Sequence, residues 1–76
     1  MALHQSAFDY LKPTDKQLRI MGDVRAQFAD LAAFLGGMLP EGPDKTYVLR
    51  HLRECSMWSM VAITRHPDGA PREEVN

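Results

Sequence analysis

Tyr10 and Lys12 lie directly before Pro13 and Thr14, where the sequence pattern predicts that a helix begins. A tyrosine ring can stack on a nucleobase, and such a contact contributes about 1 to 3 kcal/mol per base. The N-terminus of a helix attracts phosphate through its free N–H groups and its dipole, and the ammonium group of Lys12 would strengthen that attraction. This order of residues therefore suits the binding of a nucleotide. The alternative is that Tyr10 packs onto the first turn of the helix and has only a structural role.

Arg25 interrupts a helix face on which Met21, Val24 and Phe28 are apolar. An arginine in that position can meet an anion or a partner chain, or it can lie along the apolar surface with its charge in a salt bridge or in water. The spacing alone favours the second, structural role for Arg25. Arg65, close to the end of the second predicted helix, has a simpler explanation, because a cation there is stabilised by the helix dipole.

Few residues could catalyse a reaction or bind a metal. His51 and Cys55 share one helix face at a spacing of four, but a zinc site needs four ligands, or three and a water. The sequence contains no glycine-rich phosphate loop, no HExxH and no GxSxG motif. We therefore predict no catalytic residue, no metal ligand and no cofactor, and we do not expect an enzyme.

The composition narrows the possible partners. The chain has 76 residues, 45% of them hydrophobic, which suffices for one small domain. Nine Lys and Arg against ten Asp and Glu give a net charge of −1, whereas a binder of polymeric nucleic acid usually carries a basic excess. No apolar run is long enough to span a membrane, and the single cysteine suits a reducing compartment. We expect a soluble, intracellular protein with no membrane partner, and we disfavour a helix-turn-helix DNA-binding protein.

The first long helix is marked at both ends. Thr14 and Gln17 have the spacing of a capping box, in which each side chain bonds the other's backbone N–H. From there the sequence runs without proline to Pro40, and apolar residues recur at every third or fourth position. This pattern predicts a helix over about residues 15–38.

The second helix follows after a short linker rich in proline and glycine. Pro43 suits a first helical position, and we predict a helix over about residues 44–65. Two long helices with a short linker predict an antiparallel hairpin, so the fold class is all-α, with a domain over residues 1–66. The opening residues would form a short segment or helix lying across the hairpin. We expect residues 67–76, which include two prolines and a glycine, to be a mobile tail.

The second predicted helix changes character along its length. Its first half is amphipathic, with Val48, Leu49 and Leu52 facing inward and Arg50, Arg53 and Glu54 facing outward. Residues 55–63 are apolar nearly all round, and a helix of this kind must be buried on all sides. A hairpin covers only one side of it. We therefore expect other copies of the chain to cover the rest, and we predict a homo-oligomer.

Five short segments follow one another along the chain: YLKPTDKQ at 10–17, Met21 with Arg25, LPEG at 39–42, Met57 with Trp58, and AITR at 62–65. In this order they resemble the phage anti-CBASS cyclic-oligonucleotide sponges, which share a helical-hairpin domain with the Thoeris anti-defence sponges. The resemblance spans about residues 8–66. It implies a homo-hexamer of hairpins without catalytic activity, in the cytoplasm of the host bacterium. Such a protein would bind the cyclic di- and trinucleotides of bacterial immunity between its protomers and withhold them from their effector.

The resemblance also implies roles for single residues. Tyr10 matches the aromatic residue that stacks on a purine of the cyclic dinucleotide, and Arg25 matches a basic residue that contacts its phosphates. Pro13 and Thr14 would shape the wall of this pocket, beside Lys12.

The resemblance also implies a second ligand site, and the sequence leaves an alternative function possible. Arg65 would correspond to the basic residue of a separate cyclic-trinucleotide site. The alternative function is a small oligomeric helical adaptor, because the stretch around Met57 and Trp58 could bind a different protein as well as another copy.

Overall fold

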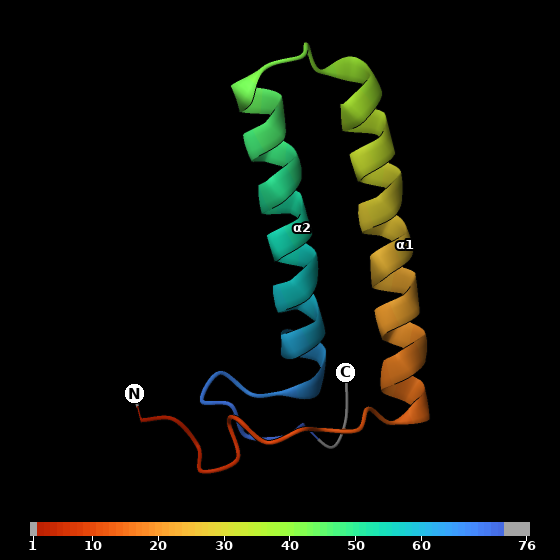
Figure 1. The fold of residues 1–76 in the computed structure, drawn as a ribbon. Coiled ribbons are helices and arrows are strands. Elements are labelled where there is room, and N and C mark those ends of the chain that lie inside the picture. Colours follow the sequence, from red (N-terminus) through yellow and green to blue (C-terminus); the bar gives the residue numbers. More distant parts are fainter. Residues whose placement is uncertain (1, 73–76) are drawn as a thin grey trace.

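Two antiparallel α-helices form the hairpin that the sequence predicts (Figure 1). The computed structural model describes residues 2–72. Helix α1 is Asp15–Met38, the same residues as the expected helix. Helix α2 is Pro43–Thr64, so it begins and ends one residue before the expected bounds. Residues 2–72 form no strand, and the all-helical fold class is confirmed.

The start of α1 is fixed by the predicted capping box. Thr14 Oγ1 accepts a hydrogen bond from the N–H of Gln17 at 3.1 Å, and Gln17 Oε1 accepts one from the N–H of Thr14 at 2.9 Å. A cap of this kind stabilises a helix by about 1 kcal/mol. It also fixes the direction in which the chain enters the helix, and therefore where Tyr10 and Lys12 lie.

The turn between the helices depends on Gly42 and Pro43. Gly42 has a φ of +151°, which residues with a side chain rarely adopt. Pro43 is the first residue of α2, where its missing N–H costs no hydrogen bond. Close by, the ammonium group of Lys45 forms an ion pair with Glu41.

Few side chains in residues 2–72 are buried. Gln17 is 3% exposed, and Ile63 is the one hydrophobic side chain among them that counts as buried. Trp58 and Met57, from the apolar half of α2, are more than half exposed. The hairpin covers only one side of each helix, as its geometry requires. The contacts are those of one chain, so the homo-oligomer and its count of six remain predictions.

The segment before α1 contains turns and no helix. The N–H of Ala7 donates to the carbonyl of His4, and the N–H of Asp9 donates to the carbonyl of Ser6, both at 3.0 Å. The short helix that we considered there does not form. No helix in residues 2–72 is both long enough and apolar enough to cross a membrane.

The chain after α2 differs from the expected tail. Within residues 67–72, the N–H of Arg72 donates to the carbonyl of Thr64 at 2.8 Å, and the carbonyl of Asp68 accepts from the N–H of His4 at 2.7 Å. Arg65 and Pro71 form an isolated antiparallel bridge. Residues 67–72 therefore have a defined place beside the N-terminal segment. The rest of the expected tail, residues 73–76, lies outside the described residues.

These contacts close the C-terminus of α2. The last carbonyls of a helix have no partner within it. Arg72 satisfies two of them, through its N–H to Thr64 at 2.8 Å and its Nε to Ala62 at 3.0 Å. The side-chain amide of Gln17 donates to a third, that of Ile63, at 3.3 Å. The end of α2 is thus capped by groups far from it in sequence.

Candidate nucleotide-binding site

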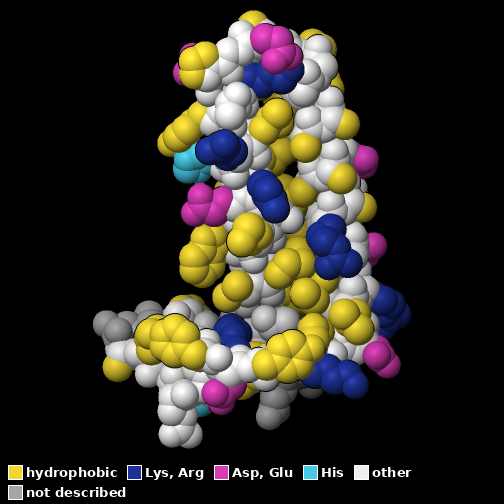
Figure 2. All heavy atoms as spheres, in the orientation of Figure 1, with side chains coloured by type: hydrophobic (Ala, Val, Ile, Leu, Met, Phe, Trp, Pro, Cys, Tyr) yellow, Lys and Arg dark blue, Asp and Glu magenta, His cyan; other side chains and the backbone are white. Residues whose placement is uncertain are grey.

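The ring of Tyr10 stands free of its own chain. It is 87% exposed, and the nearby Phe8 is 90% exposed. Tyr10 therefore does not pack onto the first turn of α1 as the structural alternative requires. Figure 2 shows hydrophobic side chains standing out from the N-terminal segment at the foot of the hairpin. A free ring beside a helix N-terminus is available to stack on a base.

The residues between Tyr10 and α1 are held by the capping box. Lys12 and Thr14 are exposed, and Pro13 is half-buried. Thr14 uses both its N–H and its hydroxyl oxygen in the capping box. Asp15 places a carboxylate in the first turn of α1, which already complements the helix dipole. Lys12 adds an exposed positive charge, suited to phosphate, at this end of the hairpin.

Arg25 lies on the face between the two helices. Its side chain is exposed, and Nη1 donates to the sulfur of Met60 in α2 at 3.8 Å. It forms no ion pair with any residue in 2–72, so the salt-bridge explanation does not hold there. A thioether sulfur is a weak acceptor, and the guanidinium group keeps most of its donors for another partner.

Arg25 lines a hollow that both helices form, with a volume of about 520 Å³. The other lining residues are Phe28, Ala29 and Ala32 from α1 and Leu49, Leu52, Arg53 and Ser56 from α2. We call this hollow the interhelical groove. Arg53 is a lining residue that the amphipathic pattern of α2 assigned to the outer face.

One chain does not bring Tyr10 and Arg25 together. Arg25 follows Thr14 by eleven residues. At about 1.5 Å per residue, it lies about 16 Å further along the axis of α1. The segment that precedes α1, which includes Tyr10, lies at the foot of the hairpin (Figure 1). A site that uses both needs a ligand that spans this distance or a second protomer.

Arg65 is held by backbone carbonyls of the two terminal segments. Its Nη1 donates to Ser6 at 2.9 Å and to Gly69 at 2.6 Å, and its Nη2 donates to Asp9. The half-buried side chain also lines a hollow of about 270 Å³ together with Trp58. Arg65 thus joins the end of α2 to the segment that leads into Tyr10.

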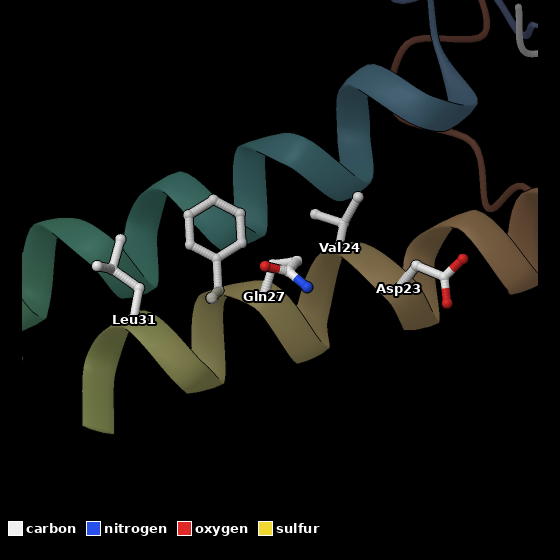
Figure 3. Close-up of a pocket in the computed structure, with 5 residues that line it drawn as sticks. Asp23, Val24, Gln27 and Leu31 are labelled. Carbon is white, nitrogen blue, oxygen red and sulfur yellow. The ribbon is translucent and has the colours of Figure 1, made fainter. Parts of the chain in front are cut away.

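A third hollow is lined by residues of α1 alone. Its lining contains a carboxylate and no arginine, unlike the two hollows above. The hollow has a volume of about 480 Å³ and is lined by Asp23, Val24, Gln27, Phe28 and Leu31. Figure 3 shows Val24 and Leu31 on the side of α1 that is turned toward the second helix, with the carboxylate of Asp23 at one end. No cation lines this hollow, so it is unsuited to phosphate.

His51 and Cys55 do not form a reactive pair with a third group. The ring of His51 lies 4.2 Å from that of Tyr47, centroid to centroid, and Cys55 is exposed. Among residues 2–72, no three His, Cys, Asp or Glu side chains group as metal ligands.

Comparison with known protein families gives one match. Residues 3–64 match the model of the Acb2/Tad1 hairpin domain. No curated protein and no solved structure matches the chain. The matched range contains Tyr10, Arg25 and Arg53 and ends one residue before Arg65.

Proposed function

Because this chain belongs to the Acb2/Tad1 hairpin family, we propose that it is a non-catalytic sponge for cyclic nucleotides. It binds the cyclic di- and trinucleotides of bacterial anti-phage immunity in the host cytoplasm and keeps them from their effector. The observation that supports this function best is the exposed ring of Tyr10 in the matched segment. The ring has no partner among the described residues of its own chain and lies next to Lys12, so it is suited to a ligand with a base and a phosphate.

The dinucleotide site combines stacking with charge. Tyr10 stacks on a purine, and Arg25 binds the phosphates, with Pro13 and Thr14 in the pocket wall beside Lys12. A stacked base contributes about 1 to 3 kcal/mol, and each charge-assisted hydrogen bond contributes roughly 1.5 to 3 kcal/mol. Two protomers that each supply a tyrosine and an arginine would reach a gross sum of about 10 kcal/mol before the cost of ordering is subtracted.

Assembly completes this site. Tyr10 precedes α1 and Arg25 lies about three turns into it, so the two are apart in one chain. We propose that a homo-oligomer, with six protomers as in the sponges that the sequence resembles, brings Tyr10 of one protomer to Arg25 of another. The weakly covered apolar half of α2, which includes Met57 and Trp58, supplies surface for that assembly.

Arg65 is proposed for the separate cyclic-trinucleotide site. Part of its guanidinium group is engaged by the carbonyls of the terminal segments, and the rest borders the hollow beside Trp58. The positive charge of Arg65, with that of Arg72 in the same lining, favours an anionic ligand there.

Native mass spectrometry with a mixture of cyclic di- and trinucleotides tests the function. We expect a closed oligomer that gains the mass of intact cyclic nucleotides and releases them unchanged on denaturation. Linear dinucleotides of the same bases serve as the matched control and should be retained much less. A closed oligomer without any adduct would reject the sponge.

The second candidate function is a protein adaptor. Trp58 is 64% exposed on one chain, and a large exposed aromatic side chain is typical of protein interfaces. This function would be favoured if the oligomer formed without any nucleotide adduct while Trp58 stayed accessible to solvent. Quenching of Trp58 fluorescence by acrylamide, measured on the intact oligomer, reports that accessibility.

A further inference from the structure

We infer that Arg53 of α2 is a second phosphate-binding residue, which works with Arg25 of α1 in the interhelical groove. The inference rests on the proposed function, because the ligand is the same cyclic dinucleotide. It adds a residue from the other helix and places Arg25 and Arg53 of one protomer in one groove.

The groove brings the two guanidinium groups to one surface. Arg25 and Arg53 lie on different helices, and both line the same hollow of about 520 Å³. That volume is in the range of sites for small organic ligands. Figure 2 shows Lys and Arg side chains over both helices, with hydrophobic surface between them.

Both arginines have donors to spare. Arg25 gives one hydrogen bond to the sulfur of Met60, and the side chain of Arg53 gives none to the described residues. Arg65 and Arg72, by contrast, donate to two or more backbone carbonyls each. A guanidinium group carries five N–H donors, so the groove offers the larger unused set.

No carboxylate neutralises this pair. The lining of the groove contains no Asp or Glu, and neither arginine forms an ion pair within residues 2–72. Two other hollows or charged places in the described chain carry acids. Asp23 lines the hollow on α1, and Glu41 pairs with Lys45 at the turn. Two like charges at the rim of one groove repel each other, and an anion between them removes that repulsion.

The apolar residues of the lining also suit a nucleotide. Phe28, Leu49 and Leu52 provide hydrophobic surface for a base or sugar, and the planar guanidinium groups suit bidentate contacts with phosphate. A cyclic dinucleotide has two phosphates in a fixed ring, so two cations from two helices can each meet one.

Substitution of Arg53 tests the inference. We would measure the affinity of wild-type protein, Arg53→Gln and Arg50→Gln for a cyclic dinucleotide by calorimetry, and the mass of each oligomer by native mass spectrometry. Arg50 is the matched control, because it is an exposed arginine one turn away on α2 that does not line the groove. We expect Arg53→Gln to weaken binding roughly 10- to 100-fold with the oligomer intact, and Arg50→Gln to stay within about twofold of wild type.

The outcomes separate this inference from the proposed function. If Arg25→Gln loses affinity while Arg53→Gln binds like wild type, the role of Arg53 is rejected and the sponge stands. If Arg53→Gln breaks the oligomer, the groove is a protein contact and the inference is rejected. If the wild-type protein binds no cyclic nucleotide at all, the proposed function and the inference fall together. Partial recovery by Arg53→Lys, which keeps the charge without the bidentate geometry, would support a phosphate contact.

Discussion

Arg65 Nη1 donates a hydrogen bond to the backbone carbonyl of Ser6 at 2.9 Å, across 59 positions of sequence. The same guanidinium group holds the carbonyl of Asp9, directly before Tyr10. The end of α2 therefore sets where the segment that leads to Tyr10 lies. This contact links the stability of the hairpin to the position of the ring proposed to stack on the ligand.

Arg65→Lys should loosen the N-terminal segment. A lysine ammonium group cannot reach three carbonyls in the geometry of a guanidinium fork, and we expect a loss of about 1 to 3 kcal/mol of stability. The amides of Ala7 and Asp9 should then exchange faster in a hydrogen-exchange experiment read by NMR. Arg19→Lys on the exposed face of α1 is the control. Unchanged exchange at Ala7 and Asp9 would contradict the anchoring role.

Tyr10→Ala should weaken nucleotide binding without breaking the fold. The ring is 87% exposed, so its loss leaves no cavity in the described chain, and the stacked base loses about 1 to 3 kcal/mol. We expect roughly 5- to 150-fold weaker binding of a cyclic dinucleotide per affected site. Phe8→Ala, an equally exposed aromatic residue two positions away, should bind like wild type. Full affinity in Tyr10→Ala would reject stacking.

Gln17→Ala should be strongly destabilising. The Gln17 amide accepts from the N–H of Thr14 and donates to the carbonyls of Ile63 and Arg72, at 3.3 and 3.0 Å. Removing it leaves these backbone groups without a partner and costs about 2 to 4 kcal/mol. Urea unfolding at fixed protein concentration measures the change. Gln27→Ala, on an exposed position of α1, should stay within about 0.5 kcal/mol of wild type.

Trp58→Glu should prevent assembly. A single hairpin tolerates the change because Trp58 is 64% exposed, whereas a carboxylate buried between copies would be costly. We expect a monomer or dimer by sedimentation velocity, together with loss of ligand binding. Arg50→Glu, on the polar half of α2, should leave the assembly intact. A wild-type protein that sediments as a monomer would refute the predicted homo-oligomer.

Gly42→Ala and Gly36→Ala should change stability in opposite directions. Gly42 has a φ of +151°, so a side chain there strains the turn by about 1 to 3 kcal/mol. Gly36 lies inside α1, where an added Cβ meets nothing within 4 Å, and alanine should stabilise the helix by about 0.5 to 1 kcal/mol. Thermal unfolding followed by circular dichroism compares the two variants. Equal effects would mean that the turn does not need glycine.

The local signals in the sequence were sufficient for the hairpin. Thr14 with Gln17 marks the start of α1, and Pro43 marks the start of α2, because caps and prolines act on the residues next to them. The role of Gln17 at the end of α2 could not be predicted in the same way. Its partners Ile63 and Arg72 are distant in sequence, and only the folded hairpin brings them together.

The site was predictable only in part. Tyr10 stands out because an aromatic residue before a helix N-terminus has a known use, and the structure leaves its ring exposed. Arg53 gave no such signal, since an arginine on the outer face of an amphipathic helix is ordinary. Its place beside Arg25 depends on how α1 and α2 pack against each other. No pattern within a single helix contains that information.

Ile63, the one buried hydrophobic side chain within residues 2–72, also determines how the chain should melt. Unfolding a lone hairpin would expose less apolar surface than unfolding a well-packed domain of this size, so its heat-capacity change should fall below the usual value of about 12 to 15 cal/mol/K per residue. A dilute chain would then lose its structure over a broad range of temperature. A sharp transition that moves to higher temperature with increasing protein concentration requires that copies bury each other's surface. Folding and assembly of this protein would then be a single thermodynamic event.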